Sequence, residues 1–272
     1  MKPDNKDKND WIEYAARAGY SAKMVVYTLL GVLAILTAFG SQSSEQLSQK
    51  GVFQEILQQP FGRVLLGLVA AGLICYAFWR IVQAVKDTEN TGDDAKGYIK
   101  RIFFVITGLI YGAGGVVAAR MVTGTSSGGS GGDNTESMTA RLMGMEWGLW
   151  LVGLLGALVL AFAFVQFKHA WKADFISKFR RGEMSQNEID ASCHAGQSGY
   201  AARGIVYLLI GIFFIQAAWT TDPQEAGGMK EVLQTLLQQP YGPWLLALVG
   251  AGLLAYGVFC GFEAKYRRTR LE

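Results

Sequence analysis

The sequence predicts an all-α membrane protein in which six transmembrane helices form three tandem helical hairpins. Composition is the first observation, because 51% of the 272 residues are hydrophobic and only 17% are charged. The second is that the apolar residues gather in six stretches of about 17 to 22 residues, the length that crosses a hydrocarbon core roughly 30 Å thick. The third is that the same residues recur in successive hairpins, which indicates internal duplication.

The six apolar stretches lie at residues 24–39, 61–85, 102–122, 147–167, 204–219 and 241–262. They are apolar on every face, whereas the helices of a soluble bundle keep a polar stripe. The stretches at 24–39 and 204–219 are short. They cross the bilayer only if the preceding Lys23 and Arg203 extend their side chains to the lipid headgroups, as long cationic side chains do.

The first and third hairpins each contain a short amphipathic helix between their two spans. Val52, Phe53 and Ile56 share one face of the first, and residues 229–237 repeat the pattern. Helices of this kind lie in the interface plane of the membrane. Pro60 and Pro240 are predicted to begin the next spans, where a missing amide hydrogen matters least. The middle hairpin has instead a Ser- and Gly-rich flexible linker at residues 126–133.

Internal repeats divide the chain into residues 1–92, 93–183 and 184–272, with two spans in each. Gly19-Tyr20, Tyr27 and Gly31 recur as Gly199-Tyr200, Tyr207 and Gly211 at one constant shift, which also relates the two Leu-Gln-Gln-Pro segments at 57–60 and 237–240. One shift that holds across a whole hairpin is strong evidence of duplication. The middle copy is weaker, but its Lys100, Phe104 and Gly108 match Lys23, Tyr27 and Gly31.

The pattern Gly-Tyr-Ala-Ala-Arg-Gly-Ile-Val-Tyr-Leu-Leu-Ile-Gly at residues 199–211, with its echoes, resembles the bacterial membrane family known as domain of unknown function 1206. The resemblance covers most of the chain and implies three two-helix units. It implies no activity, cofactor or catalytic residue. The middle repeat departs from the pattern because its Gly97-Tyr98 is shifted by one position and its Gln-Gln-Pro segment is missing.

Charge distribution predicts the orientation of the chain in the bacterial cytoplasmic (inner) membrane. Of the 25 basic residues, the side opposite the termini carries Lys50, Arg63, Arg120, Arg141 and Lys230. The excess of cations on the other side places both termini in the cytoplasm. Each repeat has two spans, so the three hairpins insert the same way up around an axis along the membrane normal. A pseudo-threefold ring is the simplest arrangement, and an irregular bundle is the alternative.

Two sets of matched positions are candidate ligand-binding residues. The cations at the start of each first helix would attract an anion or an acidic lipid headgroup if the ring forms; ordinary extension to the headgroups is the alternative. The aromatic residues one turn further on would line a cavity for an apolar or cationic ligand; packing against glycine is the alternative. The two sets are Lys23, Lys100 and Arg203, and Tyr27, Phe104 and Tyr207.

The common enzyme motifs are absent from the sequence, and it predicts neither a cofactor nor a metal site. Cys75, Cys193 and Cys260 form no CxxC pair. Cys193 is followed by His194, but adjacent side chains on a helix diverge by about 100° and do not form a catalytic pair. The expected partners are membrane lipids, and small-residue spacings also allow a homo-oligomer. The cations flank the spans and form no groove-sized patch, so nucleic acid is not expected.

The prediction for function is a non-catalytic structural or interaction protein of the cytoplasmic membrane. One alternative is a channel or carrier for a small solute along the repeat axis, and another is a protein that binds a lipid or hydrophobic ligand. The centre of the molecule distinguishes them. A closely packed centre favours the structural role, a continuous polar cavity favours transport, and a dry apolar pocket favours ligand binding.

Overall fold

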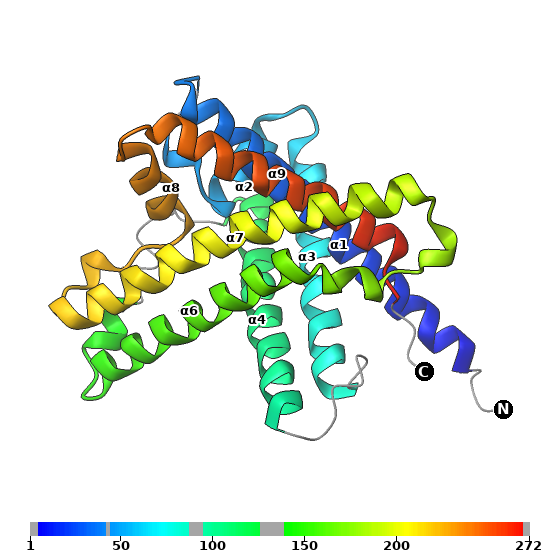
Figure 1. Ribbon diagram of the computed structural model, residues 1–272, viewed down its shortest axis with the longest axis horizontal. Coiled ribbons are helices and arrows are strands. Elements are labelled where there is room, and N and C mark those ends of the chain that lie inside the picture. The colour runs from blue at the N-terminus through cyan, green and yellow to red at the C-terminus, as the bar shows by residue number, and fades with distance from the viewer. Residues whose placement is uncertain (1–4, 42–43, 87–94, 126–138, 269–272) are drawn as a thin grey trace.

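The computed structural model describes residues 5–41, 44–86, 95–125 and 139–268, and these form helices with no β-sheet (Figure 1). The linker predicted at 126–133 lies outside the described residues. The long helices are α1 (Asn5–Ala38), α3 (Gly62–Lys86), α4 (Ala95–Thr123), α6 (Gly148–Lys172), α7 (Gln186–Thr220) and α9 (Gly242–Tyr266). The short ones are η1 (Ser44–Gln46), α2 (Gln49–Gln58), η2 (Asp174–Lys178), η3 (Arg181–Glu183), η4 (Pro223–Glu225) and α8 (Met229–Gln238).

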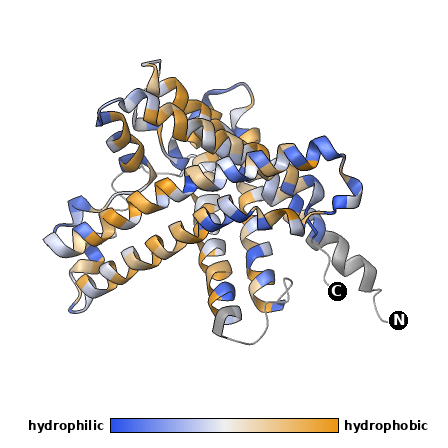
Figure 2. Ribbon diagram, in the orientation of Figure 1, coloured by the Kyte–Doolittle hydropathy of each residue, from blue (hydrophilic) through white to orange (hydrophobic). Residues whose placement is uncertain are grey.

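Each of the six long helices is long and apolar enough to cross a membrane, which confirms the predicted fold class. Figure 2 shows apolar residues along much of these helices and polar residues nearer several of their ends. Large apolar side chains remain on the outside, including Trp150 at 77% exposure and Trp219 at 88%. A soluble protein rarely exposes apolar surface on this scale, so these side chains are the surface that faces lipid.

The helices α1 and α7 are much longer than the short spans predicted for them, at 34 and 35 residues. Ser185 is the N-cap residue of α7, and its side chain and that of Glu188 form a capping box. Lys23 and Arg203 therefore lie near the middle of their helices and not at a span boundary. The prediction that they extend to the headgroups is wrong, because both are buried, with 2% and 7% exposure.

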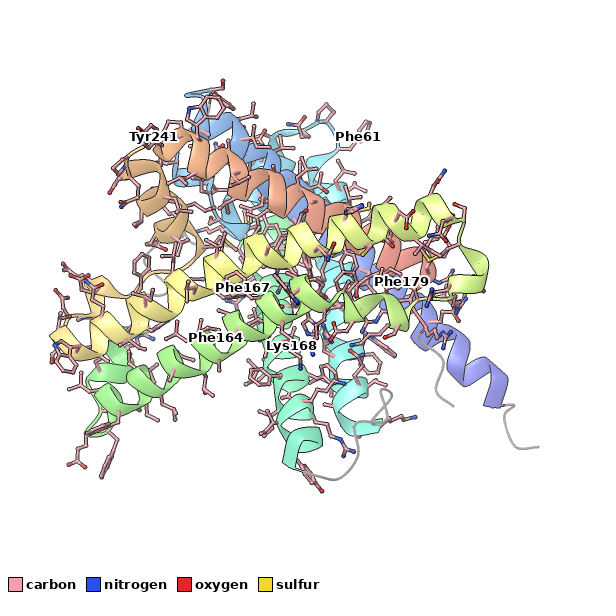
Figure 3. The ribbon with its side chains drawn as sticks, in the orientation of Figure 1. Phe61, Phe164, Phe167, Lys168, Phe179 and Tyr241 are labelled. Carbon is pink, nitrogen blue, oxygen red and sulfur yellow. The ribbon has the colours of Figure 1, made fainter. Side chains whose placement is uncertain are left out.

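The amphipathic helices α2 and α8 pack against the protein's own long helices, α2 on α3 and α8 on α9. The residues after Pro60 and Pro240 adopt the same unusual conformation, since Phe61 and Tyr241 both have a φ of 61°. The helices α3 and α9 then begin at Gly62 and Gly242, so neither Pro60 nor Pro240 occupies the first helical turn. Figure 3 shows Phe61 and Tyr241 on the same side of the molecule.

The three repeats pack in cyclic order. The second helix of each repeat lies along the first helix of the next: α3 along α4, α6 along α7, and α9 along α1 (Figure 1). The matched glycines of the repeats mark these contacts. Gly31 lies against α9 at Leu254, Gly108 against α3 at Ala77, and Gly211 against α6 at Leu160. Three equivalent glycines in three equivalent contacts support the pseudo-threefold arrangement.

The cycle of helix contacts is interrupted within the middle hairpin, between α4 and α6. In the first and third repeats the two spanning helices pack together, α1 with α3 and α7 with α9. Gly19 and Gly199 permit this, because each approaches the backbone of a tyrosine, Tyr76 or Tyr256. The helices α4 and α6 are in contact where the rings of Phe103 and Phe162 stack at 5.7 Å, but they do not pack along their length. Among the long helices that the structure describes, the contacts are therefore interrupted at one seam, between α4 and α6.

Candidate ligand cavity

A cavity of about 300 Å³ lies beside this seam, at the centre of the repeat cycle. The helices α1, α4, α6 and α7 form its walls, and α2 and α8 each contribute one residue. The volume is at the lower end of the range of about 300–1,000 Å³ that is usual for ligand pockets. The helices on the two sides of the seam supply mainly apolar side chains, which include Phe103, Ile106 and Ile110 of α4 and Leu155, Leu158 and Val159 of α6.

The cavity wall has few polar groups, and tyrosine hydroxyls are the most numerous of them. The hydroxyl groups of Tyr27 and Tyr111 are 2.9 Å apart and form a hydrogen bond. Arg203 donates from a terminal guanidinium nitrogen to the hydroxyl of Tyr207 at 3.0 Å. Gln49 of α2 also lines the cavity, and its buried Nε2 has no hydrogen-bond partner. An apolar chamber with a few convergent polar groups is the usual form of a small-molecule site.

Lys23 lies next to this chamber inside a cage of tyrosines. Its Nζ donates to the hydroxyl groups of Tyr76 at 3.2 Å and Tyr256 at 3.0 Å. The same atom lies 4.6 Å from the ring centroid of Tyr76, 5.3 Å from that of Tyr20 and 5.5 Å from that of Tyr111. Ring faces and hydroxyl oxygens both stabilise an ammonium group out of water. This environment explains how a lysine is tolerated inside a membrane helix.

Arg203 shares Tyr256 with Lys23. Its guanidinium carbon lies 4.3 Å from the ring centroid of Tyr256, 5.3 Å from that of Tyr207 and 5.6 Å from that of Tyr27. Unlike Lys23, it lines the cavity, and its buried Nε has no hydrogen-bond partner. A buried cation is costly unless it is paired and hydrogen-bonded. The Nε of Arg203 thus remains a buried donor without a partner.

Within the described residues, neither Lys23 nor Arg203 forms an ion pair with a carboxylate. The buried carboxylate of Glu263 is already paired with Arg267. The residues that line the cavity include neither aspartate nor glutamate. The centre of the protein therefore holds positive charge that its own acidic residues do not balance locally.

The predicted site residues are only partly brought together. Tyr27, Arg203 and Tyr207 line the cavity, and Lys23 lies beside it in the tyrosine cage. Phe104 is buried beneath the guanidinium of Arg80, with 5.1 Å between the guanidinium carbon and the ring centroid. The matching cation of the middle repeat, Lys100, lies against that same ring at 6.0 Å. The three repeats are thus not equivalent at these positions.

Sequence reasoning missed several residues of the cavity, among them Tyr111, Phe103 and Phe162. Tyr111 follows Phe104 by seven residues, close to two helical turns, so that spacing was the available signal. Phe103 was overlooked because the repeat alignment drew attention to its neighbour Phe104. Gln49, the first residue of α2, also lines the cavity and was not among the predicted site residues.

Enzyme chemistry finds little support in the arrangement of the described residues. They contain no cluster of three or more His, Cys, Asp or Glu side chains that could hold a metal ion. Cys193 donates its thiol toward Gln197 at 3.9 Å. The central groups, by contrast, are tyrosines, a lysine and an arginine, which suit the binding of an anion.

The comparisons with known proteins agree with the three-repeat architecture. The model of the family described as Domain of Unknown Function (DUF1206) matches residues 18–87, 102–173 and 198–267. The chain is also similar to the Uncharacterized protein YxxB of Bacillus subtilis (strain 168), with 34% identity over 272 residues that cover 100% of this chain and 97% of the relative. No solved structure matches. Since the three matched segments account for most of the sequence and each holds one pair of spanning helices, the chain belongs to the DUF1206 family.

Proposed function

We propose that this membrane protein binds a hydrophobic ligand in the central cavity, and that the ligand enters sideways from the bilayer through the seam between α4 and α6. The observation that carries the proposal is the cavity itself, whose apolar walls are largely formed by the two helices on either side of the seam. An apolar molecule dissolved in the bilayer reaches such an opening without crossing water. The helices themselves retain their packing on α3 and α7.

The packing and polarity of the centre distinguish this proposal from the structural and the transport functions. A purely structural role favours a closely packed centre, whereas this one contains a cavity of about 300 Å³. A solute channel favours a continuous polar path, whereas the walls here are mainly Leu, Ile, Val and Phe. The spanning helices also lack internal prolines in the described residues, and broken helices are frequent in transporters. Ligand binding is therefore the function that the geometry supports best.

Photo-cross-linking in lipid nanodiscs tests the proposal. The probe is a hexadecanol analogue with a diazirine in its chain, and the modified peptides are identified by mass spectrometry. We expect saturable labelling of α4 and α6 around Ile106 and Val159, reduced by unlabelled hexadecanol. The outward residues Val64 and Leu68 of α3, with 63% and 66% exposure, provide the control for lipid contact. Labelling that is equal at both places and does not saturate would contradict the proposal.

The proposed orientation places both termini in the cytoplasm of a bacterial cell, on the basis of the excess of Lys and Arg on that side. Green fluorescent protein fused to the C-terminus is expected to fluoresce, and alkaline phosphatase at the same point is expected to be inactive. Insertion of alkaline phosphatase at Ser41, after α1, should give the opposite activity. An active C-terminal phosphatase fusion would reverse the orientation.

A further inference from the structure

We infer that the ligand is a single-chain amphiphile with an anionic head, either a carboxylate or a phosphate monoester, and that Arg203 binds this head; the inference rests on the proposed function. The juxtaposition behind it is a buried guanidinium at the wall of a largely apolar cavity, with no carboxylate partner among the described residues.

Arg203 has the properties of an anion-binding residue. Its guanidinium presents five donors in a planar fork that fits carboxylate and phosphate oxygens. The hydroxyl of Tyr207 accepts one hydrogen bond, and the rings of Tyr256 and Tyr27 cover part of the group. The Nε atom remains without a partner although the residue is only 7% exposed. An anion in the cavity would lie against this guanidinium and neutralise its charge.

Among the described residues that line the cavity, no carboxylate competes with an anionic ligand for Arg203. The cavity lining contains no carboxylate from any of the helices that form it. Glu263, on the neighbouring helix α9, is held by Arg267. Lys23 adds a second positive charge on the same tyrosine, Tyr256, at 5.2 Å from its ring centroid. Because the low-dielectric interior strengthens electrostatic interactions, the two cations together favour an anion over a neutral head.

The rest of the cavity restricts the chain that the head carries. Ile106 and Ile110 face the space from α4, and Leu158 and Val159 face it from α6. These walls suit a hydrocarbon, and a volume of about 300 Å³ suits one chain better than two. The seam then allows the far end of a long chain to remain in the bilayer while the head lies at Arg203.

The test compares three probes that share a sixteen-carbon chain: hexadecanoate, hexadecyl phosphate and neutral hexadecanol. Binding is measured by competition with the diazirine probe in nanodiscs of uncharged lipid. We expect wild-type protein to bind at least one anion about ten-fold more tightly than the alcohol, as charge-assisted hydrogen bonds imply. Arg203→Gln should remove this preference, so that neither anion binds more tightly than the alcohol, and Arg203→Lys should retain part of it. The preferred anion identifies the head as carboxylate or phosphate.

The outcomes separate the two proposals. Equal binding of all three probes by the wild type would overturn the anionic head and leave the hydrophobic cavity standing. Absence of binding by all three would overturn the proposed function itself. If Arg203→Gln does not fold, ¹³C NMR of carboxyl-labelled hexadecanoate bound to wild-type protein provides a second test. Pairing with Arg203 should lower the pKa of the bound acid below its value in empty nanodiscs, and an unchanged or raised pKa would contradict the pairing.

Discussion

Replacing Val159 by tryptophan is expected to lower the affinity for the hexadecanol probe at least about ten-fold. Val159 lies on α6 and lines the cavity. The larger side chain would occupy space within a volume of about 300 Å³, so little room would remain for a hydrocarbon chain. The position borders an open space, so the indole can be accommodated without the strain that overpacking causes in a filled core. Competition photo-cross-linking in nanodiscs measures the loss.

Val165→Trp is the matched control for this variant. Val165 lies on the same helix, does not line the cavity and is 39% exposed on the outer surface. Its replacement should leave probe binding and thermal stability unchanged. Equal binding by Val159→Trp and the wild type would show that the ligand occupies another place, even if the variant is folded.

Replacing Gly31 by alanine is expected to destabilise the protein by about 1–3 kcal/mol, the usual cost of overpacking. A Cβ atom at this position would lie 2.5 Å from the backbone nitrogen of Leu254 and 2.6 Å from the carbonyl oxygen of Gly250. Both are backbone atoms of α9, so the two helices would have to separate. This contact joins the first repeat to the third, and its loss would loosen the whole cycle.

Gly67→Ala is the control, because a Cβ atom at Gly67 would meet nothing within 4 Å. Alanine also has the higher helix propensity, by about 1 kcal/mol in water. The melting temperature in detergent should therefore fall for Gly31→Ala and stay the same or rise slightly for Gly67→Ala. Similar melting temperatures for both variants would show that the contact between α1 and α9 is looser than the structure indicates.

Much of the fold could be predicted from the sequence, because the features that specify it are local and repeated. Apolar stretches define membrane spans directly, and the constant shift between Gly31 and Gly211 revealed the duplication. The capping box of Ser185 and Glu188 is also encoded locally, by two residues three positions apart. These features depend on neighbouring residues or on comparison within the chain, and neither requires knowledge of how distant helices pack.

The candidate site could be predicted less well, because it depends on the rotation and displacement of whole helices. Lys23 was expected to reach the membrane surface, but it is surrounded by tyrosines from four helices. Tyr111 and Tyr256 are far from Lys23 in the sequence, so no local pattern predicts that they are its neighbours. The repeat pattern also implied equivalence between Lys100 and Lys23, whereas Lys100 lies against the ring of Phe104.

The incomplete closure of the middle hairpin also bears on stoichiometry. Three identical hairpins in a fully closed cycle would offer either three equivalent entrances or none. Among the spanning helices described, only the two of the middle repeat do not pack along each other. The proposed entrance therefore occurs once, within the copy that departs from the repeat pattern. Under the proposed function, divergence of one copy after duplication would thus have left one binding site per polypeptide.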